Sequence, residues 1–412
     1  MKGLGVCFVR ETVSVAYRFR RFGLGQVARH ILGSAAALAL ALLPQAATAR
    51  SNPGFSFKSA PRSLHRQLAQ NEPFESAPRA FGMEESAAHR ALEAQIRAIG
   101  GSFNGDIGIA VEDVQTGWTT AYDGDTYFPQ QSVSKFWVAL TALDKADHEE
   151  LSLTRPVTLH RDDITLFHQP IAREIGSDGY TTTIGDLMFR ALTQSDNTCN
   201  DAILWRAGGP EAVRSFLRAK GISGIRFGPG ERLLQSAIAG IEWKQSYATS
   251  GGFYAARDSL PASARRAAFE HYIANPMDGA MPLGVVDALT RLKKGELLSA
   301  ESTQRLLSIM SNTKTGPQRL KGGLEPGWHL SHKTGTGQVL GTVQAGYNDI
   351  GVISAPDGHS YAIAVMIRRT SAPLQQRMQA MQNVVRSVIA YHDSAGEYET
   401  AGGSRFGGGG RR

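Results

Sequence analysis

Cysteine is nearly absent from this sequence: Cys7 and Cys199 are the two cysteines among 412 residues. Cys7 falls in an N-terminal stretch with the composition of a cleavable leader, so the processed chain would keep Cys199 alone. One cysteine forms no intramolecular disulfide and no cysteine-based zinc site, and no His-Glu-x-x-His motif occurs among the 11 histidines. We therefore expect a fold held together by its core, with no metal site.

A hydrophobic run long enough for a transmembrane helix is also missing. The apolar stretch Ile31–Leu43 covers 13 residues, which is too short to span a bilayer. Basic residues up to Arg29 precede it and Ala47-Thr48-Ala49 follows it, and these three parts are typical of a secretory signal peptide. The sequence predicts a signal peptide over residues 1–49, cleaved after Ala49, and a periplasmic or secreted protein. An N-terminal membrane anchor is the alternative.

The middle of the chain has no excess of positive or negative charge, although the formal net charge of the whole chain is +7. Six basic residues and Glu11 give residues 1–49 a net charge of +5, and three arginines fall in the last ten residues. The rest of the chain is left near −1. A basic groove for a phosphate backbone is therefore not indicated, and we expect no nucleic-acid partner.

Hydrophobic periodicity predicts an α+β fold, in which terminal helices cover a mostly antiparallel sheet and a helical block interrupts that sheet. We expect a linker over 50–82 and a disordered Gly/Arg-rich tail over 396–412. One subdomain would combine 83–124 with 283–395, and a helical subdomain would cover 125–282. The predicted helices include 84–99, 262–273, 282–294, 300–310 and 374–391, the last with Met378, Met381, Val385 and Val388 on one stripe, and Thr183-x-x-Asp186 can cap a helix of the helical block. The predicted strands are 107–111, 118–122, a segment from His329, 350–354 and 361–367, and Pro356-Asp357-Gly358 marks a hairpin between the last two.

Ser132-Val133-Ser134-Lys135 precedes the apolar run Phe136–Leu140. A serine at the start of a buried helix meets the positive end of the helix dipole, and a lysine three residues later lies on the same face. A partly desolvated ammonium could lose its proton there and act as a base toward the hydroxyl. Ser132 is therefore a candidate nucleophile. The alternative is a helix-capping serine beside a solvated lysine, and Ser311–Lys314 repeats the same spacing.

A second motif, Ser195-Asp196-Asn197, stands 63 residues after Ser132 and follows the apolar run Leu187–Leu192. In a loop between helices, its serine hydroxyl can relay a proton and its asparagine amide can hold a substrate carbonyl. A simple turn with an Asx cap would explain the same residues.

A third motif, Lys333-Thr334-Gly335-Thr336-Gly337, stands 201 residues after Ser132 in a predicted strand. A strand N–H can complete an oxyanion hole, glycine allows close approach to the backbone, and the lysine and threonines suit a substrate carboxylate. Lys314-Thr315-Gly316 is a second copy, but Pro317 follows it directly and predicts a loop.

The order S-x-x-K, S-D-N, K-T-G is similar to that of class A β-lactamases and penicillin-binding proteins. Tyr127-Phe128-Pro129, Gly208-Gly209-Pro210 and Gly327-Trp328 also resemble positions of this family, so the likeness covers about residues 84–393. The resemblance implies a β-lactamase-like fold and serine-dependent hydrolysis of small-molecule β-lactams. It also implies a monomer that needs neither a metal nor an organic cofactor.

Class A β-lactamases carry one further glutamate, within an E-x-x-L-N pattern, which activates the water that releases the acyl-enzyme. Here Glu231-Arg232-Leu233-Leu234-Gln235 begins 36 residues after Ser195 and resembles that pattern, with Gln235 in place of the asparagine. Glutamine keeps the amide donor and acceptor but is one methylene longer, so we expect a slightly displaced water. A solvated loop carboxylate is the alternative for Glu231.

The resemblance implies a role for each matched residue. Ser132 attacks the carbonyl, and either Lys135 or a water on Glu231 takes its proton. Ser195 protonates the leaving nitrogen. The substrate would be bound by Asn197, Gln235, Lys333, Thr334, Gly335 and Thr336. A D,D-carboxypeptidase or transpeptidase acting on peptidoglycan peptides, which would not need Glu231, is the nearest alternative, and a non-catalytic β-lactam sensor is the other.

Two features depart from the family pattern. The distance from Glu231 to Lys333 is 102 residues, longer than usual for the family, and the excess falls in residues 236–280. This insertion adjoins Glu231 and could line the site, although we expect its aromatic residues to form a local core. The arginine that often assists carboxylate binding has no clear match, and Arg368 and Arg369 are the candidates.

Overall fold

The computed structural model describes residues 86–249 and 251–403. Its centre is an antiparallel sheet in the order β2-β1-β10-β9-β7, with the short β8 also paired to β9. The predicted signal peptide, the linker and the last nine residues lie outside the described residues. The strands are β1 (Asp106–Asp113), β2 (Thr119–Tyr122), β7 (His329–Thr336), β8 (Val339–Leu340), β9 (Val343–Ser354) and β10 (Ser360–Thr370).

Strand β9 lies between β10 and β7 and forms the predicted hairpin with β10. It joins β10 through the Pro356-Asp357-Gly358 turn, as the sequence predicts, and Ile350 pairs with Ala364 in β10 and with Lys333 in β7. β9 begins seven residues before the predicted 350–354. Its residues are buried on both faces, so they lack the polar alternation that marks a half-exposed strand.

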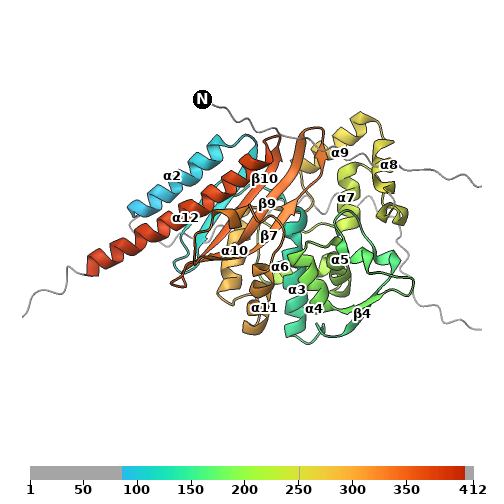
Figure 1. Ribbon diagram of the computed structural model, residues 1–412, viewed down its shortest axis with the longest axis horizontal. Coiled ribbons are helices and arrows are strands. Elements are labelled where there is room, and N and C mark those ends of the chain that lie inside the picture. Colours follow the sequence, from blue (N-terminus) through green and yellow to red (C-terminus); the bar gives the residue numbers. More distant parts are fainter. Residues whose placement is uncertain (1–85, 250, 404–412) are drawn as a thin grey trace, which may run out of the picture. The chain divides into compact units, whose positions relative to one another are not determined.

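Helices α2 (Ala87–Ser102) and α12 (Leu374–Gly403) lie side by side on one face of the sheet (Figure 1). Their apolar stripes meet strand side chains in a single cluster, which includes Ile96, Met381 and Val385 against Ile109 and Ile363. The predicted amphipathic stripe of the last helix is confirmed. α12 is longer than predicted and reaches Gly403, inside the segment expected to be disordered, because no proline interrupts it.

The other face of the sheet packs against helices. Helix α3 is buried on every side over residues 135–143, with Phe136, Trp137 and Leu140 fully inside, and it forms the axis of the helical block. Thr183 caps α4 by accepting a hydrogen bond from the Asp186 backbone N–H at 3.2 Å, as its position predicts. The helices here are α3 (Lys135–Asp147), α4 (Ile184–Thr193), α5 (Asn197–Arg206), α6 (Gly209–Ala219), α10 (Pro282–Lys293) and α11 (Ala300–Ser311).

Residues 236–280 form helices next to Glu231, which is the first residue of α7 (Glu231–Ala239). Helix α7 packs its Leu234 and Ile238 against Phe269 and Ile273 of α9. α9 (Ala262–Ala274) matches the predicted helix 262–273, and α8 (Gly252–Asp258) was not predicted. Two strand pairs were also missed because they are only two to four residues long: β3 (Phe128–Pro129) with β6 (Gly279–Ala280), and β4 (Pro156–Leu159) with β5 (Tyr180–Thr183).

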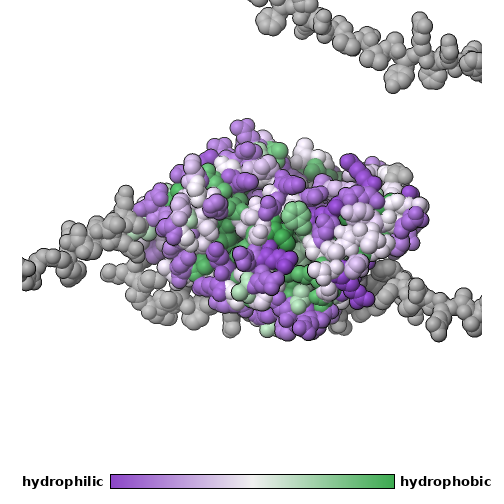
Figure 2. Space-filling model, turned by 60° about the horizontal axis from the view of Figure 1, so that its bottom comes forward, coloured by the Kyte–Doolittle hydropathy of each residue, from purple (hydrophilic) through white to green (hydrophobic). Residues whose placement is uncertain are grey.

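The surface is mainly hydrophilic on the face shown in Figure 2, where hydrophobic side chains appear in small separate groups. In residues 86–249 and 251–403, no helix combines the length and apolar character needed to cross a membrane.

Candidate active site

Ser132 lies on a tight turn at the entrance to the buried helix. The 3-10 turn Gln131–Ser134 holds it, and α3 starts at Lys135, so the serine precedes the helix by one turn instead of standing on its first residue. Gln131 adopts a positive φ of 54°. A left-handed residue before the serine turns the chain sharply, which helps keep the Ser132 side chain partly exposed while its neighbours are buried.

Lys135 links the serine to the glutamate. Its Nζ donates to Ser132 Oγ at 2.9 Å and forms a close ion pair with Glu231 Oε1. The lysine and glutamate side chains are 0% and 5% exposed. The predicted convergence of these three residues, 99 positions apart along the chain, is therefore present, and Glu231 is not the solvated loop carboxylate of the alternative interpretation.

Gln235 contacts the same glutamate from one turn along α7. Its Nε2 donates to Glu231 Oε2 at 3.3 Å and to Gln131 Oε1 at 3.0 Å, while its Oε1 accepts from Gln338 Nε2 at 2.9 Å. The amide is therefore held from both ends. Because the direction of this amide is set by its neighbours, the extra methylene of glutamine does not leave it loose.

The insertion reaches the residue before the serine through a buried carboxylate. Asp278 Oδ2 accepts from the Gln131 backbone N–H at 2.8 Å and from the Tyr272 hydroxyl at 3.2 Å. Burial raises the pKa of Asp278 to about 6. Sequence reasoning missed Gln131, Tyr272 and Asp278, and the one available signal was the position of Gln131 directly before Ser132.

Ser195 and Lys333, from two different motifs, are joined by a hydrogen bond next to the cavity that Ser132 lines. Ser195 lies in the loop between α4 and α5 with a φ of 61°, and Lys333 Nζ donates to its Oγ at 3.0 Å. Lys333 is fully buried, and this burial holds the pKa of its ammonium well below the usual range, lowered further by the charges of Lys135 and Arg319. A buried amine with a lowered pKa next to a hydroxyl can exchange a proton with it.

Asn197 begins α5, and the cap of that helix comes from its neighbour. Asp196 accepts from the Cys199 backbone N–H at 2.9 Å, so the Asx cap that we considered as an alternative is present together with the site. The Asn197 amide nitrogen donates to the Leu166 carbonyl at 2.8 Å. That bond fixes the side chain and leaves its oxygen as the group that it can offer to a ligand.

The end of β7 presents two threonines to the site. Thr334 shares a hydrogen bond of 2.6 Å with Thr315, and Thr336 is exposed at the strand end. Gly335, by contrast, does not line the cavity: a Cβ there would stand 2.3 Å from the Gln130 carbonyl oxygen. Glycine is needed here because β7 passes close to the chain segment before Ser132, and the approach of a substrate is not the reason.

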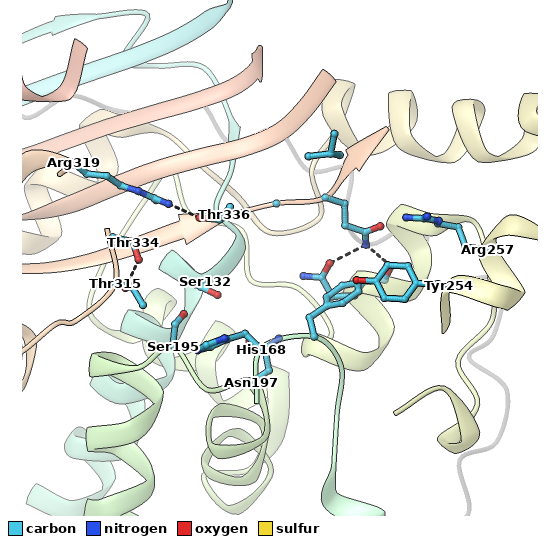
Figure 3. A pocket seen from close by; sticks show the side chains of 15 residues that line it. Ser132, His168, Ser195, Asn197, Tyr254, Arg257, Thr315, Arg319, Thr334 and Thr336 are labelled. Carbon is cyan, nitrogen blue, oxygen red and sulfur yellow. Dashed lines mark hydrogen bonds between the residues drawn. The ribbon is translucent and has the colours of Figure 1, made fainter. Parts of the chain in front are cut away.

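Ser132, Ser195 and the two threonines of β7 face a cavity of about 500 Å³ (Figure 3), whereas Lys135, Glu231 and Lys333 lie behind its lining. In the part of the chain that the structure describes, no group of three or more His, Cys, Asp and Glu residues could hold a metal. The cavity is lined by Ser132, Phe167, His168, Ser195, Asn197, Gln235, Tyr254, Arg257, Thr315, Arg319, Thr334, Thr336, Gly337, Gln338 and Val339.

Comparison with known proteins gives one consistent result. The family model described as the β-lactamase enzyme family matches residues 91–392. The chain belongs to this family. It is 27% identical over 289 residues to β-lactamase VEB-1 of Pseudomonas aeruginosa, a match that covers 70% of this chain and 86% of that protein. It also matches the crystal structure of the TLA-3 extended-spectrum β-lactamase with a TM-score of 0.60 and 24% identity, over 73% of this chain and 98% of that one.

A third match indicates the class. An ancestral class A β-lactamase is 27% identical to the chain with a TM-score of 0.56, and the match covers 73% of this chain and 99% of that one. The predicted family and fold class are confirmed, and so is the prediction of an enzyme that hydrolyses the cyclic amide of β-lactams. The roles of single residues stay predictions.

The arginine beside Thr334 and Thr336 in the cavity of this β-lactamase is Arg319. Its guanidinium donates to the Gly335 carbonyl at 2.9 Å and to Thr336 Oγ1 at 2.5 Å, and it stacks 3.8 Å from the centre of the Tyr347 ring. Arg368 and Arg369 were the wrong candidates, because they pair with Asp106 and Glu270. The sequence held one signal: Arg319 closes the loop that begins with the second Lys-Thr-Gly triplet.

Asp201 was also missed, and it gives the β-lactamase a testable pH dependence. Its Oδ1 accepts from the Glu231 backbone N–H at 3.1 Å, and burial, followed by the nearby Glu231 carboxylate, raises its pKa to about 6. The folded state thus binds a proton more tightly than the unfolded state, where the pKa is near 3.8. Ionisation of the Asp201 carboxyl therefore lowers the free energy of unfolding progressively as the pH rises from about 4 to about 6.

We expect Asp201→Asn to gain stability relative to the native protein over that pH range, because asparagine can accept the same hydrogen bond without ionising. The difference in unfolding free energy should grow by up to about 3 kcal/mol between pH 4 and pH 7. Urea unfolding of both proteins at a series of pH values measures it. A difference that stays constant or shrinks with rising pH would show that Asp201 does not titrate in this way.

Proposed function

We propose that this chain is a serine β-lactamase in which Ser132 is the nucleophile and Glu231 activates the water that releases the acyl-enzyme. The observation that carries the proposal is the position of Lys135 Nζ, which contacts both Ser132 Oγ and Glu231 Oε1. The buried Lys135 ammonium thus links Ser132, which would be acylated, to Glu231, which would activate the deacylating water.

In the first step, Ser132 Oγ attacks the β-lactam carbonyl carbon. Its proton passes to Lys135, which becomes a base by giving a proton to Glu231, or it passes through a water to Glu231. Both routes fit the contacts, since Lys135 and Glu231 share the close ion pair. The backbone N–H groups of Ser132 and Thr336 would hold the oxyanion. The C–N bond then breaks, and Ser195 supplies the proton to the departing nitrogen.

Lys333 supports the proton transfer through Ser195. Its ammonium donates to Ser195 Oγ at 3.0 Å, and its lowered pKa makes that ammonium a stronger proton donor. The proton that Ser195 gives up can therefore be replaced from Lys333. Burial of Lys333 keeps this transfer away from bulk water.

In the second step, Glu231 takes a proton from a water that attacks the ester carbon, and Ser132 leaves with a proton returned through Lys135. Gln235 would place the water, because its amide is fixed against Glu231 and Gln131. The carboxylate of the substrate would be bound by Thr334, Thr336, Lys333 and Arg319. The amide in the side chain of the substrate would be bound by Asn197.

The proposal also includes the compartment and the state of the protein. Ile31–Leu43 and Ala47-Thr48-Ala49 are typical of a signal peptide, so we infer export to the periplasm or the medium with cleavage after Ala49. We further infer a monomer that acts on small-molecule β-lactams without a metal or an organic cofactor.

The intact mass of the purified protein during the minutes after addition of a penicillin tests the proposal. We expect prompt hydrolysis of the penicillin with no lasting adduct. An adduct that persists for hours would indicate the peptidase or the sensor instead. If no adduct and no turnover are found, Ser132 is not a nucleophile toward β-lactams. Ser132→Ala is the control and should show neither.

A further inference from the structure

The cavity has a second end, away from Ser132, that the mechanism above does not use. Figure 3 shows Tyr254 and Arg257 there, on the opposite side of the cavity from Thr334 and Arg319. Both come from α8 of the insertion, one helical turn apart. Phe167 and Val339 also line the cavity. Phe167 is 38% exposed, and Val339 and Tyr254 are each 50% exposed. Large apolar side chains gathered around one cavity usually mark a binding surface.

Buried residues of a small core support this apolar surface. Phe253 is 2% exposed and packs with Leu166 and Ala239, and its ring meets the Phe167 ring edge-on with 4.9 Å between centroids. Phe167 itself has a φ of 58°. A bulky residue in that conformation is strained and persists where the surroundings hold it. The Phe167 and Tyr254 rings, with centroids 6.0 Å apart, are therefore already in position to contact a ligand.

The same end carries an excess of positive charge. Arg257 and Arg265 both bond the single Asp258 Oδ1, at 3.1 Å and 3.2 Å, so one carboxylate is shared by two guanidinium groups. Arg257 lines the cavity and Arg265 does not. The residues that line the cavity include two arginines and no aspartate or glutamate. A guanidinium at each end suits a ligand that carries two carboxylates.

We propose that Phe167, Tyr254 and Arg257 form a subsite for the acyl side chain of the β-lactam, and that it selects side chains that combine a planar group with a terminal carboxylate. The planar part would lie on the two rings and the carboxylate would meet Arg257. Arg319 at the other end would take the carboxylate on the β-lactam nucleus. This inference rests on the proposed function, since it assumes that a β-lactam occupies the cavity.

Two cephalosporins that differ at one group provide the test. Cefixime and cefdinir share the nucleus, the 3-vinyl group and the aminothiazole ring, and cefixime carries a carboxymethoxyimino group where cefdinir has a hydroxyimino group. We expect the native enzyme to show a kcat/KM for cefixime about tenfold above that for cefdinir, a modest factor because Arg257 is partly exposed.

Arg257→Ala should lower kcat/KM for cefixime about tenfold and that for cefdinir less than threefold, so the preference disappears. Arg265→Ala is the matched control, because it removes the other arginine on Asp258 and should keep the preference. An equal loss on both substrates, or a native enzyme without the preference, would overturn the subsite. If a simple penicillin is hydrolysed but neither cephalosporin is, the subsite alone fails. If none of the three is hydrolysed, the proposed function fails.

Discussion

Glu231→Gln is expected to turn the enzyme into a protein that remains acylated after a single encounter with a penicillin. Glutamine keeps the size of the side chain and an oxygen that Lys135 can bond, but it cannot take a proton from water. Deacylation should fall by about 10³-fold, because general-base catalysis commonly contributes 10²–10⁴-fold. Intact mass spectrometry should show one mole of adduct that lasts for hours, where the native protein shows none after minutes.

Two further variants make this result specific to the carboxylate. Ser132→Ala/Glu231→Gln should form no adduct, which would locate the acyl group on the serine. Glu231→Asp keeps a carboxylate but withdraws it from the water, so we expect partial recovery of turnover relative to Glu231→Gln. Should Glu231→Gln hydrolyse penicillin within threefold of the native rate, Glu231 would not be the deacylating base.

Lys135→Met should lose acylation and stability together. Lys135 Nζ bonds Ser132 Oγ, and its neutral amine, formed by proton transfer to Glu231, is the nearest base to that hydroxyl. Without it we expect acylation to slow by about 10³-fold. Glu231 would be left buried without its partner, which should cost about 3–5 kcal/mol of unfolding free energy. Stopped-flow acylation with a chromogenic β-lactam and urea unfolding measure the two effects.

The double variant Lys135→Met/Glu231→Gln separates them. Because it removes both charges of the pair, it should regain most of the stability while acylation stays slow. A Lys135→Met protein that acylates at the native rate would assign the base to the water on Glu231. A double variant no more stable than Lys135→Met would show that the ion pair is not the source of the loss.

Much of the site was predictable because its signals are local. The run Phe136–Leu140 indicates a buried helix. Ser132 and Lys135 stand three residues apart at its start, and this spacing places both side chains on the same side. The Pro356-Asp357-Gly358 turn and the stripe of Met381 and Val385 are local in the same sense. Glu231 was predictable for another reason, because its spacing from Ser195 resembles a known family.

The buried carboxylates were not predictable. Nothing next to Asp201 or Asp278 in the sequence sets them apart from other polar residues, and their partners stand 30 and 147 positions away. Arg319 was missed for a related reason. A guanidinium can reach the site from several elements, and the sequence does not show that Asp106 and Glu270 already hold Arg368 and Arg369.

The insertion shows where the sequence reached its limit. The sequence by itself determined that a helix forms at 262–273, that the insertion adjoins Glu231, and that the nucleophile, its lysine and the Lys-Thr-Gly strand occur in the family order. It could not decide between Phe253 and its neighbour Tyr254, of which one is 2% exposed in a small core and the other 50% exposed at the cavity. Adjacent residues on a helix point in different directions, and only the packing of α8 against Leu166 and Ala239 decides which of them faces inward.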